Sequence, residues 1–478
     1  MHRQRYSTMR VFNTLTRTKE EFTTIEPGHV RMYACGPTVY NLIHIGNSRP
    51  LIVFDVLRRY FEYCGNKVTF VQNFTDIDDK IINRANDEGC DYKTISERYI
   101  EEFWKDAKGL GVKPATIHPK ATENIDEIIS IISGLIEKGH AYESGGDVYF
   151  ATSSFSEYGK LSHIPLSDLL DGASERVDDL GLKRESTDFA LWKSSKPGEP
   201  YWESPWGHGR PGWHIECSAM CRRFLGETLD IHCGGQDLIF PHHENEIAQS
   251  ECCNGQPFAR YWMHNGFITV DNEKMSKSLN NFFTVRDVAE KFGYEPIRMM
   301  ILGCHYRSPL NYSVDVIEQS KAALKRMYTC RENLEFLLKA AENTDSFAEG
   351  EQARADELSA HRDRFIEAME DDLNTAGAIS CIFDLVRDAN TYCGTASGAS
   401  GALVKHALDL LNELTGVLGL LYVREDDNLD AEIEALIQQR QQARKEKNFA
   451  EADRIRDELK AQGIVLEDTP QGVKWHRQ

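Results

Sequence analysis

The sequence contains no run of about 18 apolar residues, so it predicts no membrane-spanning helix. Its first ten residues, MHRQRYSTMR, are basic but lack the apolar segment of a secretory signal. Met9 is an alternative start, which would make residues 1–8 a dispensable extension. Positive charge is also scarce, because 75 acidic residues outnumber 55 Lys and Arg and give a net charge of −20. This balance argues against indiscriminate nucleic-acid binding, although it allows a local basic face. We therefore expect a soluble, cytoplasmic, globular protein.

Motifs that define several common protein classes are missing as well. No G-x-G-x-x-G lies between residues 30 and 76, where a strand and the helix after it would carry one, so a dinucleotide-binding fold has no support, and the chain has no H-E-x-x-H of a zinc hydrolase. Its twelve cysteines are scattered over 478 residues, unlike the dense spacing of a secreted disulfide scaffold. We expect reduced thiols, most of them small core residues and a few of them metal ligands.

The N-terminal third contains a strand–helix–strand pattern. Residues 30–35 alternate and are rich in β-formers, residues 48–65 form an apolar helical segment with Ser48 as N-cap, and residues 67–76 form a second strand. A βαβ unit of this length predicts a parallel sheet.

The rest of the chain predicts an insertion and a helical C-terminal part. Helical periodicity occurs at 124–139 within polar, loop-rich sequence, and it continues from Ser313 to about residue 421. A charged linker then precedes two helices and a hairpin around Asp468–Gly472. The predicted fold is a Rossmann-like α/β domain with an insertion, then an α-helical bundle and a small mixed α+β domain. The predicted segments are 10–120 and 209–310 for the two halves of the α/β domain, 121–208 for the insertion, 311–423 for the bundle and 424–478 for the last domain.

The stretch DLIFPHHENEIAQSECC, residues 237–253, is rich in metal-ligand side chains. On a helix whose first turn contains Pro241, His242 and Glu246 share a face, and His243 and Glu244 point elsewhere. Two ligands do not make a zinc site, and thiolates are the usual partners. Spacing alone does not choose among the candidates Cys35, Cys217, Cys221 and Cys233, and a solvated acidic helix is the alternative.

Two further motifs favour a nucleotide. HIGN (44–47) follows the first predicted strand where a helix begins, and KMSKS (274–278) lies about 230 residues later. Lysines stabilise phosphate charge in a transition state, and a helix N-terminus adds a favourable dipole. Together, in this order, the motifs indicate a triphosphate site.

The chain resembles the cysteinyl-tRNA synthetases, a family of class I aminoacyl-tRNA synthetases, from about residue 10 to its end. Two positions depart from the family pattern: Asn47 stands where the class motif usually ends in His, and Cys233 stands where glycine is common. Because Asn47 replaces the second His of the motif, His44 carries more of the motif's role. Cys233 adds a thiol that could compete as a metal ligand. The motifs that carry the resemblance are YACGPTVYNLIHIGN, NFTDIDDKII, GRPGWHIECSAM, FPHHENEIAQS, WMHNGF, EKMSKSLNNF and GIVLEDTPQGVKW.

The resemblance implies a zinc ion and a reaction. It assigns the zinc ligands as Cys35, Cys217, His242 and Glu246. Zinc binds a thiolate and has little affinity for a neutral hydroxyl, so it would select cysteine over serine without an editing domain. The implied reaction activates L-cysteine with Mg-ATP and transfers it to the terminal ribose of tRNA(Cys). We expect a monomer with no membrane partner.

The resemblance also implies roles for other residues. Some carry alternatives: Trp213 as an ordinary core residue, the carboxylates of 75–80 as helix caps, and Trp475 as an anchor of the last domain. The implied catalytic stabilisers are His44, His232, Lys274 and Lys277; the nucleotide contacts are His44, Gly46, Gly235, Asp237 and Lys277; the amino-acid contacts are Gly36, Thr75, Asp76 and Trp213; and the tRNA contacts are Asp468, Trp475 and Arg477.

Three other functions remain open. A ligase of the same fold joins cysteine to an amino sugar, but it lacks a tRNA-anticodon module, and the C-terminal 150 residues argue against it. A zinc hydrolase leaves KMSKS unexplained, and a pure RNA-binding protein does not need the nucleotide motifs. Residues 436–478 contain nine Lys or Arg against seven Asp or Glu, so this segment is the relatively basic part of an acidic chain. Phosphate contacts are therefore expected there.

Overall fold

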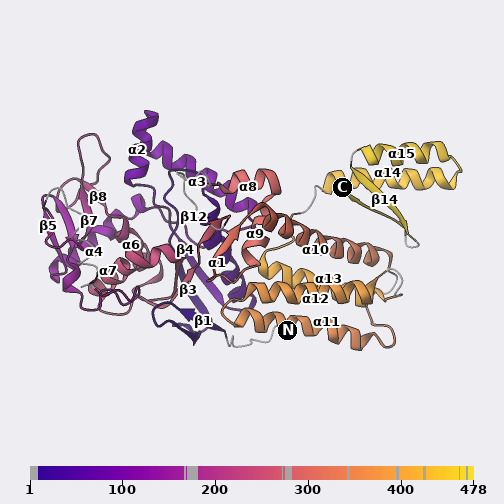
Figure 1. Cartoon of the computed structure of the whole chain (residues 1–478), viewed down its shortest axis with the longest axis horizontal. Coiled ribbons are helices and arrows are strands. Elements are labelled where there is room, and N and C mark those ends of the chain that lie inside the picture. Colours follow the sequence, from indigo (N-terminus) through magenta and orange to yellow (C-terminus); the bar gives the residue numbers. More distant parts are fainter. Residues whose placement is uncertain are drawn as a thin grey trace. The chain divides into compact units, whose positions relative to one another are not determined.

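The computed structural model describes residues 9–165, 168, 181–271, 273–274, 282–341, 345–394, 398–423, 427–461, 463–469 and 472–477 (Figure 1). The chain divides into two compact units. Unit 1 comprises Met1–Lys321 and Ile366–Ala378, and unit 2 comprises Ala322–Phe365 and Ile379–Gln478.

A four-stranded parallel sheet forms the centre of unit 1. Its strands are β3 (His29–Ala34), β4 (Lys67–Gln72), β9 (Leu229–Gly235) and β10 (Ala259–Asn265), in the order β10–β9–β3–β4. All three neighbouring pairs are parallel, and α1 (Ile45–Tyr63) connects β3 to β4. The predicted Rossmann-like α/β fold is therefore confirmed. Because the strands are parallel, the residues that follow them meet at one edge of the sheet, where ligands of such folds bind.

Helix α1 begins three residues earlier than predicted. Ser48 is not the N-cap, since its hydroxyl donates to the Ile45 carbonyl inside the helix. The start is fixed at His44 instead, where the Asn47 side chain accepts the main-chain N–H of His44 at 3.2 Å. Long-range main-chain pairing of His44 with Thr284, which no local pattern reveals, holds the same point.

The predicted insertion and the three residues that follow it contain a sheet that the sequence did not predict. Helix α4 (Ile125–Glu137) is followed by β5 (Ala141–Ser144), β6 (Asp147–Phe150), β7 (Phe189–Ser194) and β8 (Gly209–Pro211). These strands form an antiparallel sheet in sequence order, and their apolar side chains join one core with those of α4. Strands of three to six residues are too short to stand out from polar surroundings.

The remaining elements of unit 1 surround these two sheets. The two-stranded and three-stranded sheets of this unit have the orders β1–β2 and β12–β11–β13. The elements are β1 (Arg10–Asn13), β2 (Thr18–Glu21), α2 (Asp79–Glu88), α3 (Tyr92–Gly109), α6 (Trp213–Leu225), α7 (Glu244–Asn254), β11 (Ile268–Val270), β12 (Glu273–Lys274), α8 (Val285–Phe292), α9 (Tyr294–Leu302) and β13 (Leu310–Tyr312), with short helical turns at Ala121–Glu123, Thr152–Ser154, Gln236–Leu238 and Ile239–His243.

Helices dominate the C-terminal part of the chain, as predicted. Helices α10 (Val314–Ala340), α11 (Glu351–Glu370), α12 (Thr375–Cys393) and α13 (Gly401–Leu418) are followed by α14 (Asp427–Lys445) and α15 (Phe449–Ala461). The hairpin is present, with β14 (Ile464–Thr469) antiparallel to β15 (Gly472–Arg477). Isoleucine and leucine side chains of α14, α15 and β14 form a core of their own. Within the described residues, no helix has the length and apolar character to cross a membrane.

Candidate metal centre and active site

Four potential metal ligands converge from four separate elements of unit 1. Cys35 follows β3, Cys217 lies in α6, His242 lies in the kinked turn Ile239–His243, and Glu246 lies in the first turn of α7. Their ligand atoms all lie within 4.8 Å of one another. Cys35 Sγ lies 3.7 Å from Cys217 Sγ and 3.3 Å from Glu246 Oε1. His242 Nε2 lies 3.1 Å from Glu246 Oε1 and 3.6 Å from Cys217 Sγ.

The chemistry of this donor group fits a zinc ion. Two thiols, one imidazole and one carboxylate are ligands that zinc takes in four-coordinate sites. Burial raises the pKa of the Cys35 thiol, and the neighbouring Cys217 and Glu246 raise it further. Burial also opposes ionisation of Glu246, but the charges of His232 and His242 and their hydrogen bonds lower its pKa to about 2. A bound dication would relieve this opposition to ionisation of the Cys35 thiol.

Histidines surround the donor group. His232 Nε2 lies 2.8 Å from Glu246 Oε2, and His214 Nδ1 lies 2.8 Å from His242 Nδ1. His243 Nδ1 lies 2.8 Å from His264 Nε2. Such partners orient metal ligands and fix which ring nitrogen faces the metal.

The prediction that His243 points elsewhere is wrong. Its Nε2 lies 3.3 Å from Cys35 Sγ, and a second, overlapping donor group consists of Cys35, His232, His243 and Glu246. The prediction considered only the four-residue spacing, but His243 and Glu246 are three residues apart, which also places two side chains on one face of a helix, and His243 Nε2 lies 3.9 Å from Glu246 Oε1. Glu244 does point elsewhere, because its carboxylate accepts main-chain N–H groups of residues 159, 161 and 162.

The structure distinguishes among the four candidate cysteines. Cys35 and Cys217 belong to a donor group, whereas neither Cys221 nor Cys233 belongs to one among the described residues. Both of the latter are fully buried, and burial raises the pKa of each thiol well above its usual value.

The predicted amino-acid contacts lie around the donor group. The Trp213 ring lies 4.3 Å from the His242 ring between centroids and is 42% exposed, so it is not a buried core side chain. The Thr75 hydroxyl donates to the buried carboxylate of Glu216 at 2.8 Å. A Cβ on Gly36 would lie 1.6 Å from the Asn73 carbonyl oxygen, so no side chain fits there.

The carboxylates of residues 75–80 already have partners. Asp76 accepts from the main-chain N–H of Thr122 at 3.0 Å and from its hydroxyl at 2.5 Å. Asp78 caps α2 by accepting the main-chain N–H of Lys80 at 2.8 Å. The helix-cap alternative therefore holds for Asp78, and Asp76 anchors the turn that begins at Ala121.

The predicted nucleotide contacts follow β3 and β9 of the parallel sheet. His44 and Gly46 lie at the start of α1, and Gly235 ends β9, with Asp237 exposed two residues later. Burial lowers the pKa of His44 to about 4, and its Nδ1 is buried with no hydrogen-bond partner among the described residues. Lys274 contributes its main chain to β12, and Lys277 lies outside the described residues.

The predicted tRNA contacts are only partly described. Trp475 packs half-buried against the isoleucine and leucine core of its own domain. The side chains of Asp468 and Arg477 lie outside the described part of the chain.

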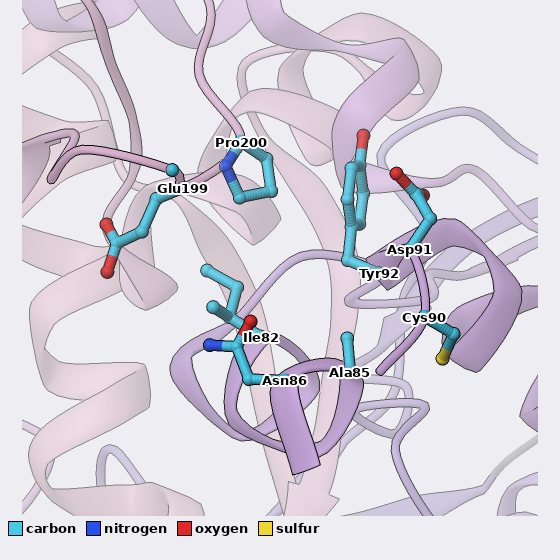
Figure 2. A pocket seen from close by; sticks show the side chains of 9 residues that line it. Ile82, Ala85, Asn86, Cys90, Asp91, Tyr92, Glu199 and Pro200 are labelled. Carbon is cyan, nitrogen blue, oxygen red and sulfur yellow. The ribbon is translucent and has the colours of Figure 1, made fainter. Parts of the chain in front are cut away.

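A separate pocket of about 260 Å³ opens between α2, the start of α3 and residues 198–200. Figure 2 shows Ile82, Asn86, Tyr92 and Pro200 around it. None of the predicted site residues lines this pocket, so it is distinct from the donor group.

Comparison with known proteins defines the class. Residues 21–322 match the family model of the "tRNA synthetases class I (C) catalytic domain", and residues 364–422 match the DALR domain. The fold is similar to that of Mycobacterium tuberculosis methionyl-tRNA synthetase in complex with methionyl-adenylate, with a TM-score of 0.61. That similarity covers 82% of this chain and 90% of the other at 16% identity, and it concerns the fold alone. The catalytic part is that of a class I aminoacyl-tRNA synthetase.

Two curated relatives narrow the class to one family. The cysteine–tRNA ligase of Caldicellulosiruptor saccharolyticus is 56% identical over 471 residues, which cover 98% of this chain and all of the relative. The cysteine–tRNA ligase of Symbiobacterium thermophilum is 57% identical over 98% of this chain and 99% of the relative. Residues 426–475 also match the cysteinyl-tRNA ligase anticodon binding domain. The chain belongs to the cysteinyl-tRNA synthetase family.

Proposed function

We propose that this chain carries out the reaction after which its relatives are named, cysteine–tRNA ligation. L-cysteine and Mg-ATP give cysteinyl-adenylate and pyrophosphate, and the cysteinyl group then passes to the 3′-terminal ribose of tRNA(Cys). The observation that carries the proposal is the group of Cys35, Cys217, His242 and Glu246, of which the last three are buried, beside the carboxyl end of β3. These four side chains suit a metal ion that binds thiols, and they lie at the edge of the sheet where nucleotides bind in such folds.

The donor group would recognise the substrate by its sulfur. A zinc ion held by these four side chains would supply a position that prefers a thiolate to a hydroxyl and so separates cysteine from serine. An apolar pocket alone discriminates poorly between side chains that differ by so little. Trp213, exposed and against His242, forms one wall of the amino-acid pocket. The absence of a side chain on Gly36 lets the Asn73 main chain pack against the residue next to Cys35.

The chain's other residues act on the phosphates by position and charge. The substrate carboxylate attacks the α-phosphate directly, so no protein nucleophile is needed, and the rate comes from alignment and charge stabilisation. Because its pKa is about 4, the His44 imidazole is neutral near pH 7 and acts as a hydrogen-bond donor rather than a cation. Lys277, and to a lesser extent Lys274, supply positive charge that stabilises the negative charge of the phosphates as it shifts in the transition state.

His232 acts through Glu246 rather than on the substrate. Its side chain is 0% exposed, and its Nε2 faces the Glu246 carboxylate. We therefore assign it to positioning of the metal ligand, in place of the phosphate-stabilising role that the sequence suggested.

The C-terminal domain would read the tRNA. Residues 426–475 match an anticodon-binding domain, and this segment is relatively basic in an acidic chain. The same match disfavours the cysteine–amino-sugar ligase, which needs no such domain. We expect a monomer that works in the cytoplasm, where its substrate tRNA is charged.

Exchange of pyrophosphate into ATP tests the proposal. The full chain should catalyse exchange that depends on cysteine and does not occur with serine. It should then esterify tRNA(Cys) and leave an amino sugar unmodified. Exchange without charging of tRNA, or charging with serine as readily as with cysteine, would refute it.

A further inference from the structure

Arg49 joins the start of α1 to two distant main-chain segments. Its side chain is 0% exposed. Nη1 donates to the carbonyl oxygens of Gly266 and Phe267, each at 2.9 Å, and Nη2 donates to that of His305 at 3.0 Å. One guanidinium therefore holds the segment after β10 and the segment after α9 against the HIGN helix.

The charge of Arg49 has no carboxylate partner in the described part of the chain. Arg298 offers a contrast, because it is equally buried and its Nη2 forms an ion pair with Asp55 Oδ2 at 2.6 Å. A buried cation without a counter-charge is costly, and the hydrogen bonds to carbonyl oxygens must offset that cost. The planar guanidinium suits three such acceptors, whereas a lysine ammonium does not reproduce this fork.

The bonded segments border the carboxyl edge of the parallel sheet. Gly266 follows β10, whose last residues His264 and Asn265 lie opposite Gly234 and Gly235 of β9. A Cβ on Gly266 would lie 2.7 Å from the carbonyl oxygens of residues 307 and 308, so the two segments are already in close contact. His44, the residue before α1, lies five residues before Arg49.

We propose that Arg49 is a positioning residue for adenylate formation, which fixes the end of β10 and the start of α1 relative to each other. The inference rests on the proposed function, since it concerns the reaction at that edge. Displacement of reacting groups by about 1 Å can lower a rate by about 10²-fold. A change at Arg49 should therefore reduce kcat more than it changes substrate binding.

Arg49→Lys, with Arg298→Lys as a matched control, tests the role. Arg49→Lys keeps the charge but not the three-carbonyl fork, and we expect kcat for cysteine-dependent exchange to fall about 10-fold or more. The KM for cysteine should change less than about 3-fold, and zinc content should equal that of the unchanged protein. Arg298→Lys alters an equally buried arginine that also contacts α1 and should lower thermal stability with kcat nearly unchanged.

Gly266→Ala is a second variant that disturbs the main-chain segments held by Arg49. Its Cβ presses on the carbonyl oxygens of residues 307 and 308 while Arg49 stays intact, so the same loss of kcat with little change in KM is expected. An unchanged kcat in folded Arg49→Lys, or equal losses in Arg49→Lys and Arg298→Lys, overturns the inference. If Arg49→Lys does not fold, an unchanged kcat in Gly266→Ala overturns it. A wild-type chain without cysteine-dependent exchange would instead refute the proposed function.

Discussion

His232 and Glu246 form a fully buried pair in which Nε2 lies 2.8 Å from Oε2. The other carboxylate oxygen, Oε1, lies 3.1 Å from His242 Nε2 and 3.3 Å from Cys35 Sγ. One carboxylate oxygen of Glu246 therefore faces His242 and Cys35, while the other contacts His232. A ligand supported in this way keeps one orientation, which commonly sets the affinity of a metal site.

Replacement of His232 should weaken zinc binding. In His232→Asn the Glu246 carboxylate loses its supporting partner, and we expect zinc affinity to fall about 10- to 100-fold. Competition with a chelating indicator measures this. His118→Asn is the control, because His118 is a partly buried histidine stacked on Phe74 and belongs to neither donor group. Unchanged zinc affinity in folded His232→Asn would contradict the role.

Removal of the Trp213 ring should weaken cysteine binding without loss of zinc. Trp213→Ala takes away one wall of the pocket beside His242, and the KM for cysteine should rise about 10-fold, or about 1.4 kcal/mol. Tyr201→Ala, which removes another exposed aromatic ring in unit 1, should leave this KM unchanged. Steady-state pyrophosphate exchange gives both values. A Trp213→Ala protein with wild-type KM would show that the ring does not border the substrate.

Lys277 should act on the transition state rather than on bound substrate. Lys277→Ala should lower kcat for adenylate formation about 10²-fold or more, with a smaller change in the KM for cysteine. Lys291→Ala, in the last turn of α8, is the matched control for loss of a lysine charge. A change confined to KM would be inconsistent with the assignment.

A chain ending at about residue 425 should separate the two half-reactions. The parallel sheet and the donor group lie upstream, and the removed segment has its own apolar core, so cysteine-dependent exchange should persist. Aminoacylation should fall, mainly through a higher KM for tRNA, because the relatively basic domain is gone. Full tRNA charging by the truncated chain would assign this domain another task.

Local periodicity in the sequence predicted the features that depend on residues close together in the chain. The βαβ pattern, the C-terminal helices and the final hairpin follow from residues close in sequence. The pairing of His242 with Glu246 does too, since four residues span one helical turn, and their side chains are 3.1 Å apart. The resemblance to a known family supplied Cys35 and Cys217, which spacing did not distinguish from Cys221 and Cys233.

Long-range packing decided the features that the sequence did not reveal. His243 contacts Cys35, which lies 208 positions earlier in the chain, and His232 contacts Glu246 from β9. Arg49 likewise meets carbonyl oxygens more than 200 positions away. No local pattern encodes such contacts, because their partners come together only in the folded sheet.

Zinc content and cysteine-dependent pyrophosphate exchange, measured on the same preparations, test the central claim most directly. The wild-type chain should contain about one zinc per chain and activate cysteine but not serine. Cys217→Ser should lose zinc and cysteine activation together. Cys221→Ser, four residues further along α6 and outside both donor groups, should retain both. Full zinc occupancy in Cys217→Ser, or cysteine activation that survives complete loss of zinc, would contradict the account.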